Sequence, residues 1–573
     1  MKKINILLFA VSLAFLAVSC AKEAQENGTE GKNLVTLRAA VESRTAPASK
    51  VSIESETGKF FWSTGDRIAV GTSEGYINSE ALEAGGESAA YKVDLKGAVR
   101  QNFAVLPVGA AVAGHETAAD LQVTLPAEYE LENLKSEVSP VVMIAKGNTA
   151  DADLLTFRHV GGLFRLAVKD VPKGVNKLTV TFDRDVTGTF TVADADTDTP
   201  TITTSGVTDR NTVTFVFPAL SAMQDVTLNI PVPVGTFGLI TVKSWVDNVE
   251  FPCRITVGKA SGLAVARKAA FGKDVYMPVF SVSATRKVVF SPGNLEAYTT
   301  NYGANWTWRF AEEQYSLLSS SATVDGKMHI STESGARMHF RWSTAKAADY
   351  GINAEATGAS YLEYVNGTFL DWGTNAIEWG GYTYPENTWR TLGNEKCYYF
   401  SRTYAGIDKT LDGTRGEWGY LFEERPASTV HGLKTHTGTE EEDMENTRFM
   451  KVRIDSKDAI RGVVLFPDHF EMPEGLEFLY SDTTLPHLPA YLNRTDAWYR
   501  TELSMADWKK LEAAGCVYIP RGDTFYYTST YNAGDATSFG VNMFNIMSSG
   551  NDIRVGWGRP WQNYQVRLVR DAN

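Results

Sequence analysis

The stretch Phe61–Val70, FWSTGDRIAV, encodes the fold of the first part of the chain most clearly. Gly65 and Asp66 predict a tight turn, because glycine tolerates a positive φ and an aspartate side chain accepts hydrogen bonds from nearby backbone amides. Trp62 and Ile68 flank this turn, and we expect both to be buried. The stretch therefore predicts two β-strands that meet at a turn and cover one apolar core.

Short runs of β-branched and aromatic residues continue on the C-terminal side of this stretch. Runs such as LQVTL (121–125) and LTVTF (178–182) alternate between apolar and polar residues, and Gly, Pro, Asp and Asn separate them. Alternation of this kind predicts strands, and regularly spaced short strands are typical of β-sandwiches. We therefore predict two all-β sandwich domains, over residues 34–150 and 151–277.

The composition changes at about residue 278. Only Trp62 and Trp245 of the 13 Trp residues precede residue 300, and the remainder of the chain is rich in Trp, Tyr and Gly. The segment 504–515 predicts a helix, since it has a Ser N-cap, an acidic residue three positions later and a closing Gly. We expect a second helix at 416–425 and strands at 461–467, 517–520 and 564–570, hence an α+β domain rich in loops over 278–573.

The chain begins with a basic, then apolar, segment that ends at Cys20. A run of this length is typical of a secretory signal and is too short to span a bilayer as a helix. The sequence AVSC (17–20) resembles a bacterial lipobox, which implies cleavage before Cys20 and acylation of its thiol with fatty acids such as palmitate. We predict a signal peptide at 1–19, a lipidated tether at 20–33 and an outer-membrane lipid anchor with the body on the cell surface. An ordinary cleaved signal with an incidental cysteine is the alternative.

Three motifs of the first half occur in a family-specific order: FWSTGDRIAV (61–70), NFAVLP (102–107) and TFRHVGGLFRL (156–166). This half resembles the fimbrillin-like (Mfa-like) lipoprotein family of Bacteroidetes. The resemblance implies two β-sandwiches in a surface lipoprotein or pilus subunit. It also implies maturation by cleavage after an Arg, for which Arg44 is the candidate, and polymerisation by strand donation. Anchored relatives that never polymerise form the alternative.

Motifs of the second half are FSPGNL (290–295), WRFA (308–311), DWG (371–373), WRTL (389–392) and VRLV (566–569). They resemble a domain recurrent in Bacteroidetes surface proteins, which is distantly similar to the formylglycine-generating-enzyme and C-type-lectin-like folds. Formylglycine-generating enzymes bind copper through paired cysteines near the C-terminus, whereas Cys516 has no partner after it. We therefore expect no catalytic residue and no cofactor.

Metal and nucleic-acid binding are not indicated. His159 has no second ligand at useful spacing, and Asp194–Asp198 lacks the Gly and Glu of a calcium loop, which favours a hairpin turn. A net charge of −13 disfavours nucleic acid. A disulfide between Cys397 and Cys516 is the alternative to free thiols, which the scattered single cysteines favour.

Exposed aromatic side chains can stack on the apolar faces of sugar rings. Trp557, Trp561 and Tyr564 form one candidate glycan-stacking cluster. A second contains Trp372, Trp379, Tyr382 and Tyr384, with Asn375 and Glu378 beside them. Packing in a core is the alternative for every one of them, because Trp and Tyr bury large areas.

The sequence thus predicts a non-catalytic cell-surface lipoprotein for adhesion or ligand presentation, including the role of an accessory pilus subunit. Its expected partners are membrane lipid through Cys20, other pilus subunits, and host or dietary glycan. The alternative function is that of a glycan-binding lipoprotein in a polysaccharide-uptake system.

Overall fold

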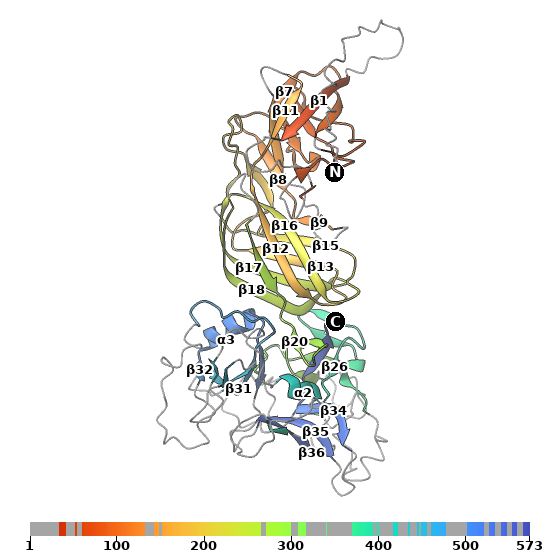
Figure 1. Ribbon diagram of the computed structural model, residues 1–573, viewed down its shortest axis with the longest axis vertical. Helices are drawn as coiled ribbons and strands as arrows, with labels where there is room; N and C mark the ends of the chain where they lie inside the picture. The colour runs from red at the N-terminus through yellow and green to blue at the C-terminus, as the bar shows by residue number, and fades with distance from the viewer. Residues whose placement is uncertain are drawn as a thin grey trace, which may run out of the picture.

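The computed structural model describes residues 34–41, 52–53, 60–86, 88–131, 134, 142–147, 152–204, 206–264, 271–298, 307–316, 340, 369–393, 398–399, 416–421, 434–435, 444–445, 449–454, 460–476, 501–520, 526–532, 540–546, 553–558 and 565–573. Their regular structure is mainly β-strand, arranged in several sheets. The chain is elongated, with β1 (Leu34–Val41) near one end and the strands of 278–573 at the other (Figure 1).

The first part forms one seven-stranded sheet in the order β5-β4-β7-β10-β11-β1-β6. Besides β1, its strands are β4 (Ala69–Thr72), β5 (Gly75–Asn78), β6 (Ala89–Asp94), β7 (Arg100–Leu106), β10 (Met143–Gly147) and β11 (Leu154–His159). Buried side chains from six of the seven strands form one cluster with Trp62, and Ile77 of β5 packs against it. After β5 the chain returns to β6, where the Glu80 N–H donates to the Lys92 carbonyl at 2.8 Å. In the described residues this unit is therefore a single curled sheet, beside the small β2–β3 pair (Ser52–Ile53, Phe60–Phe61), and not the two facing sheets predicted.

The turn predicted at Gly65 and Asp66 is confirmed. Gly65 has a φ of +90°, and the Ser63 N–H donates to the Asp66 carboxylate at 2.5 Å. Trp62 and Ile68 are 1% and 0% exposed. Burial raises the pKa of Asp66 to about 6, although the hydrogen bond from Ser63 acts in the opposite direction.

The second part is a sandwich of two facing sheets, as predicted. One sheet has the order β16-β12-β19 and the other β18-β17-β13-β15-β9. Their bounds are β9 (Glu128–Glu130), β12 (Gly162–Val171), β13 (Lys177–Phe182), β15 (Thr212–Val216), β16 (Gln224–Val232), β17 (Gly235–Val246), β18 (Val249–Ala264) and β19 (Phe271–Tyr276). Alternate side chains of the two sheets, such as Leu166 on β12 and Val180 on β13, belong to one buried cluster, because successive strand residues point to opposite faces.

Hydrogen bonding and packing both cross the predicted division at residue 150. Strand β11 follows this division in the sequence but belongs to the first sheet, where it pairs with β1 and β10. Strands β8 (Gln122–Leu125) and β9 precede the division but pair with strands that follow it, β8 with β14 (Gly188–Thr191) and β9 with β15. Side chains of the two parts also share a buried cluster that includes Val105, Ile144, Phe190 and Ile202. The division stays a prediction about domains, but the two parts form one packed body.

The third part, which we call the head, contains four four-stranded sheets and two short α-helices among its described residues. Their orders are β20-β21-β37-β26, β22-β23-β24-β25, β27-β36-β35-β34 and β32-β30-β31-β33. The strands are β20 (Phe280–Ser281), β21 (Lys287–Phe290), β22 (Leu295–Tyr298), β23 (Thr307–Phe310), β24 (Ile377–Trp379), β25 (Tyr382–Tyr384), β26 (Arg390–Thr391), β27 (Tyr398–Tyr399), β30 (Phe449–Ile454), β31 (Ile460–Leu465), β32 (Thr501–Leu503), β33 (Val517–Pro520), β34 (Tyr526–Asn532), β35 (Gly540–Ile546), β36 (Ile553–Gly558) and β37 (Leu568–Asp571), with the separate β28–β29 pair (Lys434–Thr435, Met444–Glu445).

Both predicted helices are present, α2 (Gly416–Leu421) and α3 (Met505–Ala513). The Ser504 hydroxyl accepts from the Asp507 N–H, which is the N-cap expected from the sequence. Gly515 follows α3 with a φ of +87°. The strands predicted at 461–467, 517–520 and 564–570 correspond to β31, β33 and β37.

Buried polar residues hold the loops of the head in place. The Asp371 carboxylate caps η3 (Trp372–Thr374) by accepting from the Gly373 N–H at 3.0 Å, and it accepts from the N–H and hydroxyl of Thr391. Burial raises the pKa of Asp371 against the effect of these hydrogen bonds. Gly373 lies so close to Trp389 that a Cβ there would be 1.8 Å from the Trp389 carbonyl oxygen.

The head is docked on the sandwich through a continuous core. Trp372, Trp389 and Val566 of the head belong to the same buried cluster as the sandwich strands. The Tyr384 hydroxyl donates to the Glu250 carbonyl at 2.7 Å, and the Lys173 N–H donates to the Ala572 carbonyl at 2.8 Å. The C-terminus therefore lies at this junction, as Figure 1 shows.

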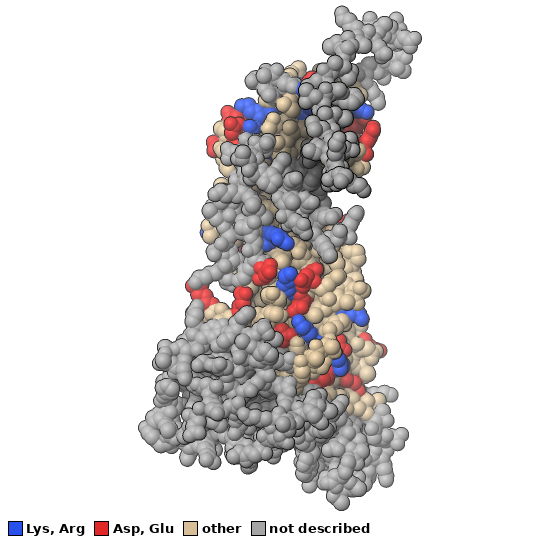
Figure 2. Space-filling view, in the orientation of Figure 1, with Lys and Arg blue, Asp and Glu red and all other residues tan. Residues whose placement is uncertain are grey.

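Charged side chains of both signs are intermixed on the face of the described residues that Figure 2 shows. Several form ion pairs between neighbouring strands, such as Lys169 with Asp225 at 2.9 Å and Lys243 with Glu250 at 3.2 Å.

None of the helices in the described part of the chain has the length and apolar character needed to cross a membrane.

Candidate functional site

The residues of the first predicted glycan-stacking cluster are only partly described. Trp557 lies on β36, opposite Asn542 of β35. Trp561 and Tyr564 lie outside the described residues, as do Cys20 and Arg44. This cluster, the lipidation at Cys20 and the cleavage at Arg44 therefore stay predictions.

The second predicted cluster is divided between core and surface. Trp372 is fully buried and stacks on Tyr527 at a centroid distance of 5.8 Å, while Tyr384 is 2% exposed. For these two the alternative of core packing is confirmed. Trp379 and Tyr382 lie on the β24–β25 hairpin and are only partly buried.

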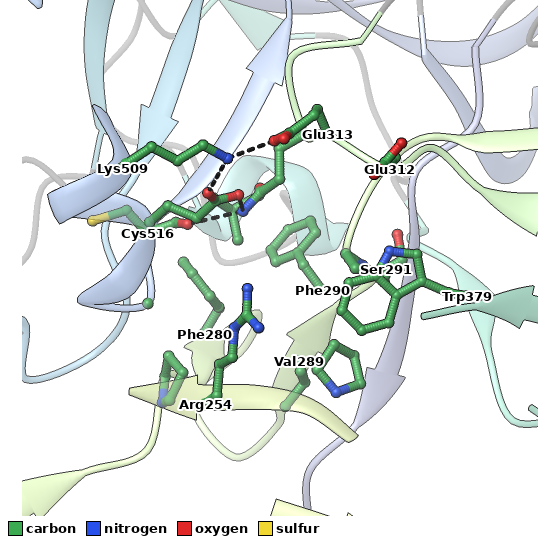
Figure 3. A pocket seen from close by; sticks show the side chains of 17 residues that line it. Arg254, Phe280, Val289, Phe290, Ser291, Glu312, Glu313, Trp379, Lys509 and Cys516 are labelled. Carbon is green, nitrogen blue, oxygen red and sulfur yellow. Dashed lines mark hydrogen bonds and ion pairs between the residues drawn. The ribbon is translucent and has the colours of Figure 1, made fainter. Parts of the chain in front are cut away.

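Trp379 lines a cavity of about 160 Å³ at the junction of the sandwich and the head, which we call the junction cavity (Figure 3). The sandwich contributes Pro252 and Arg254 of β18, and the head contributes the remainder of the wall. Its lining residues are Pro252, Arg254, Pro278, Phe280, Val289, Phe290, Ser291, Pro292, Glu312, Glu313, Gln314, Trp379, Lys509, Glu512, Gly515, Cys516 and Val517. The cavity therefore combines aromatic and aliphatic surface with charges of both signs.

One polar wall of the junction cavity is fixed by interactions within the protein. The Lys509 ammonium group donates to Glu313 at 2.5 Å and to Glu512 at 2.8 Å. Burial lowers the pKa of Lys509, but the hydrogen bonds to the two carboxylates outweigh it and the net shift is upward. Gln314 donates to Glu512 at 3.1 Å and accepts from the Tyr518 N–H at 2.9 Å. Lys509 thus stays charged and holds both carboxylates.

Two further charges are less engaged. Arg254 reaches only 3.9 Å from the Glu250 carboxylate, and its side chain is 46% exposed. Glu312 is exposed, and it makes no hydrogen bond or ion pair with the other described residues. In Figure 3 the Arg254 guanidinium rises from β18, and the Trp379 indole extends from another side of the cavity. One cation, one anion and one aromatic face are therefore available to a ligand.

The remaining predicted polar features are structural. The Thr197 N–H donates to the Asp194 carbonyl at 3.0 Å, which confirms the turn predicted for Asp194–Asp198, and Asp198 pairs with Arg158 at 2.6 Å. His159 ends β11 opposite Met143. In the described ranges, no group of three or more His, Cys, Asp or Glu side chains is arranged to hold a metal ion.

Two of the cysteines are described. Cys253 and Cys516 are free and buried, while Cys397 lies outside the described residues. Burial raises the pKa of both described thiols well above its usual range. Since the thiolate is the nucleophilic form, neither thiol is activated for chemistry.

Sequence reasoning identified Trp379 but not Arg254 or Glu312. Arg254 lies in a strand in which a polar residue at alternate positions is ordinary, and Glu312 follows the WRFA motif without a pattern of its own. The cavity exists only where β18 meets the head, so no local sequence signal marks it.

No family model matches the chain, and no curated protein matches it either. Among solved structures, a proposed cell adhesion protein from Bacteroides ovatus is 13% identical over 43% of this chain and 93% of its own, with a TM-score of 0.29. A proposed cell adhesion protein from Bacteroides eggerthii is 11% identical over 44% of this chain and 89% of its own, with a TM-score of 0.22. A fimbrial protein from Bacteroides ovatus is 11% identical over 94% of this chain and 99% of its own, with a TM-score of 0.18. Because all three TM-scores are low, the proposals below rest on this chain's own residues.

Proposed function

We propose that this chain is a non-catalytic, lipid-anchored protein of the cell surface that presents its head for adhesion. The observation that carries the proposal is the continuous packing from β1 to the C-terminus. The curled sheet shares a buried cluster with the sandwich, and the sandwich shares one with the head. Because β1 lies near the end of the molecule remote from the head, a membrane anchor before β1 holds the head away from the bilayer (Figure 1).

The anchor in this proposal is the acylated Cys20. Each buried methylene of an acyl chain contributes about 0.8 kcal/mol, so two or three chains hold a folded body on a bilayer. Residues 21–32, AKEAQENGTEGK, contain no large apolar side chain and suit a solvated tether. The outer membrane is the proposed location.

A fimbrial role is a more specific form of the same proposal. β1 lies inside the first sheet, parallel to β11 on one side and antiparallel to β6 on the other. Cleavage after Arg44 would allow β1 to leave, and the unpaired edges of β11 and β6 could then accept a strand from another subunit. The buried side chains of Leu37 and Ala39 show what such a donor strand would have to replace.

The head is proposed to have a C-type-lectin-like fold. The pairing of its first long strand with its last supports this, since β21 and β37 are antiparallel neighbours with Phe290 opposite Val569. Such a closure keeps the two ends of the head together at the sandwich.

The test compares cells that produce the wild-type chain with cells that produce Cys20→Ser or lack the chain. We expect the wild type to incorporate labelled palmitate, to sediment with the outer membrane and to support adhesion to a glycan-coated surface, whereas Cys20→Ser is released and does not support it. Ser63→Ala, a change on the folded body, is the matched control for secretion. Retention of Cys20→Ser in the membrane, or equal adhesion by cells that lack the chain, would contradict the proposal.

A further inference from the structure

We infer that the junction cavity binds one ring of an uncharged glycan, stacked on Trp379 and hydrogen-bonded by Arg254 and Glu312. This inference rests on the proposed presentation of the head, and it names the class of ligand and the place where it binds. Its residues differ from those of the predicted cluster, which are Trp557, Trp561 and Tyr564.

The cavity has a size that suits a single sugar ring. A space of about 160 Å³ accepts a single six-membered sugar ring but no folded partner. The exposure of Arg254 and Glu312 places the cavity in contact with solvent, so the neighbouring rings of a longer glycan can extend outward. Small-molecule sites of this kind commonly occur at domain interfaces.

The surface of the cavity has apolar and polar parts that match those of a sugar ring. A pyranose ring has an apolar face of C–H groups, which suits the partly exposed indole of Trp379 and the apolar Phe290 and Val289. Its hydroxyl groups both donate and accept hydrogen bonds. Arg254 offers only donors and ionised Glu312 offers only acceptors, so the pair complements a hydroxylated ring.

The charges decide between an uncharged and a charged ligand. Lys509, Glu313 and Glu512 are already engaged with one another. The charges left for a ligand are one cation and one anion, Arg254 and Glu312, which together favour neither sign. An acidic sugar would face Glu312 and Glu512, and an amino sugar would face Arg254 and Lys509. In each case a like charge lies on the cavity wall.

The sandwich and the head both contribute to the proposed ligand contacts. Arg254 belongs to β18 and Trp379 to β24, so a ligand that contacts both needs the two parts in fixed positions. The Tyr384–Glu250 hydrogen bond and the Lys287–Asp170 ion pair, at 2.7 and 2.9 Å, hold them there. Preorganisation of this kind lowers the entropic cost of binding.

The experiment uses the full chain and the methyl glycosides of glucose, galactose and mannose, with methyl glucuronide and methyl glucosaminide as charged probes. Saturation-transfer NMR detects binding, and titration gives dissociation constants. We expect at least one uncharged glycoside to bind, with its ring C–H protons saturated most strongly. We expect Trp379→Ala to weaken binding by about tenfold or more, and Arg254→Gln and Glu312→Gln each by about three- to tenfold.

Matched controls separate the site from general effects. Thr383→Ala changes an exposed side chain of the same hairpin that does not line the cavity, and Glu386→Gln removes an exposed charge elsewhere on the head. Both should bind like the wild type. Thermal melting verifies that each variant is folded, and Arg254→Gln, at an exposed position, keeps the test valid if Trp379→Ala does not fold.

Three results would overturn the inference: no binding of any uncharged glycoside at millimolar concentration, binding of a charged probe alone, or binding unchanged in both Trp379→Ala and Arg254→Gln. None of these would affect lipidation at Cys20 or exposure of the head on cells. Conversely, a head that proves to face the periplasm would remove the adhesion role while leaving the measured binding intact. The two proposals therefore fail separately.

Discussion

The curled sheet and the head bury their tryptophans in different ways. Trp62, 1% exposed, lies under strands that pair with one another in a continuous seven-stranded ladder. Trp372 and Trp389, 0% and 3% exposed, lie under loops that the Asp371 side chain and a close backbone contact at Gly373 hold in place. Regular hydrogen bonding thus determines one core, and a few buried polar contacts determine the other.

The two regions also differ in their attachment to the sandwich. The core round Trp62 is a cluster of its own, and the curled sheet meets the sandwich through a second, separate cluster. The core round Trp372 is continuous with the sandwich core. We therefore expect the head and sandwich to unfold together and the curled sheet to unfold more independently.

The largest expected effect tests this difference directly. Trp62→Ala and Trp372→Ala each remove a buried indole and should cost about 3–5 kcal/mol of stability. Segment-resolved hydrogen exchange should show increased exchange only in residues 34–159 for Trp62→Ala, but in both head and sandwich for Trp372→Ala. Equal loss of protection in all three parts with Trp62→Ala would remove the distinction between the two attachments.

Gly373→Ala tests whether the close packing of the loops stabilises the head. A Cβ would be 1.8 Å from the Trp389 carbonyl oxygen, so the loop must move, and we expect a loss of about 3 kcal/mol or more in the free energy of unfolding. Gly206→Ala is the control, because a Cβ there meets no atom within 4 Å. Denaturant unfolding should separate the two; similar stabilities would mean that the loop tolerates the displacement.

Arg390 joins three elements of the head by ion pairs. Its guanidinium donates to Glu417 at 2.7 and 2.6 Å and to Asp571 at 3.0 and 2.7 Å, which links β26, α2 and the C-terminal strand. Arg390→Gln leaves two carboxylates without this partner and should cost about 2 kcal/mol. Limited proteolysis should release the C-terminal strand faster from Arg390→Gln than from the wild type. Lys509→Gln, which breaks ion pairs that do not involve this strand, should leave the release unchanged. Release at the same rate from both variants would contradict this role of Arg390.

The smallest expected effect is a pH dependence of opposite sign for Asp66 of the curled sheet and Asp571 of the head. Burial raises the pKa of Asp66 from 3.8 to about 6, so the folded curled sheet binds a proton more tightly than the unfolded chain does. Its stability should therefore rise as the pH falls from about 6 to about 4. For Asp571 burial acts upward, but the hydrogen bonds and charge of Arg390 lower the pKa overall. The contribution of Asp571 to the stability of the head should therefore be lost as the pH falls below about 4, while the raised pKa of Asp371 acts in the opposite direction.

Hydrogen exchange at several pH values measures both regions in one sample. Asp66→Asn should abolish the gain in the curled sheet without changing the head. An unchanged pH dependence in this variant would assign the gain to another group.

The sequence revealed regular structure better than it revealed the site. The alternation of LTVTF (178–182) and the Ser504 cap of α3 are local signals, and both are present as predicted. The curl of the first sheet depends on β11 and β1, which are far apart in the chain, so local patterns suggested two sheets instead. The same reason hides the junction cavity, because Arg254 and Trp379 come together only when the head docks.

The central claim is that the head is presented outside the cell, and proteolysis of intact cells tests it most directly. Cells that produce the chain are treated with a protease before and after lysis, and fragments are detected with antibodies against residues 503–520 of the head and against a periplasmic marker. The proposal predicts that the head is cleaved on intact cells while the marker is protected. A head that survives on intact cells and is cleaved only after lysis would contradict it.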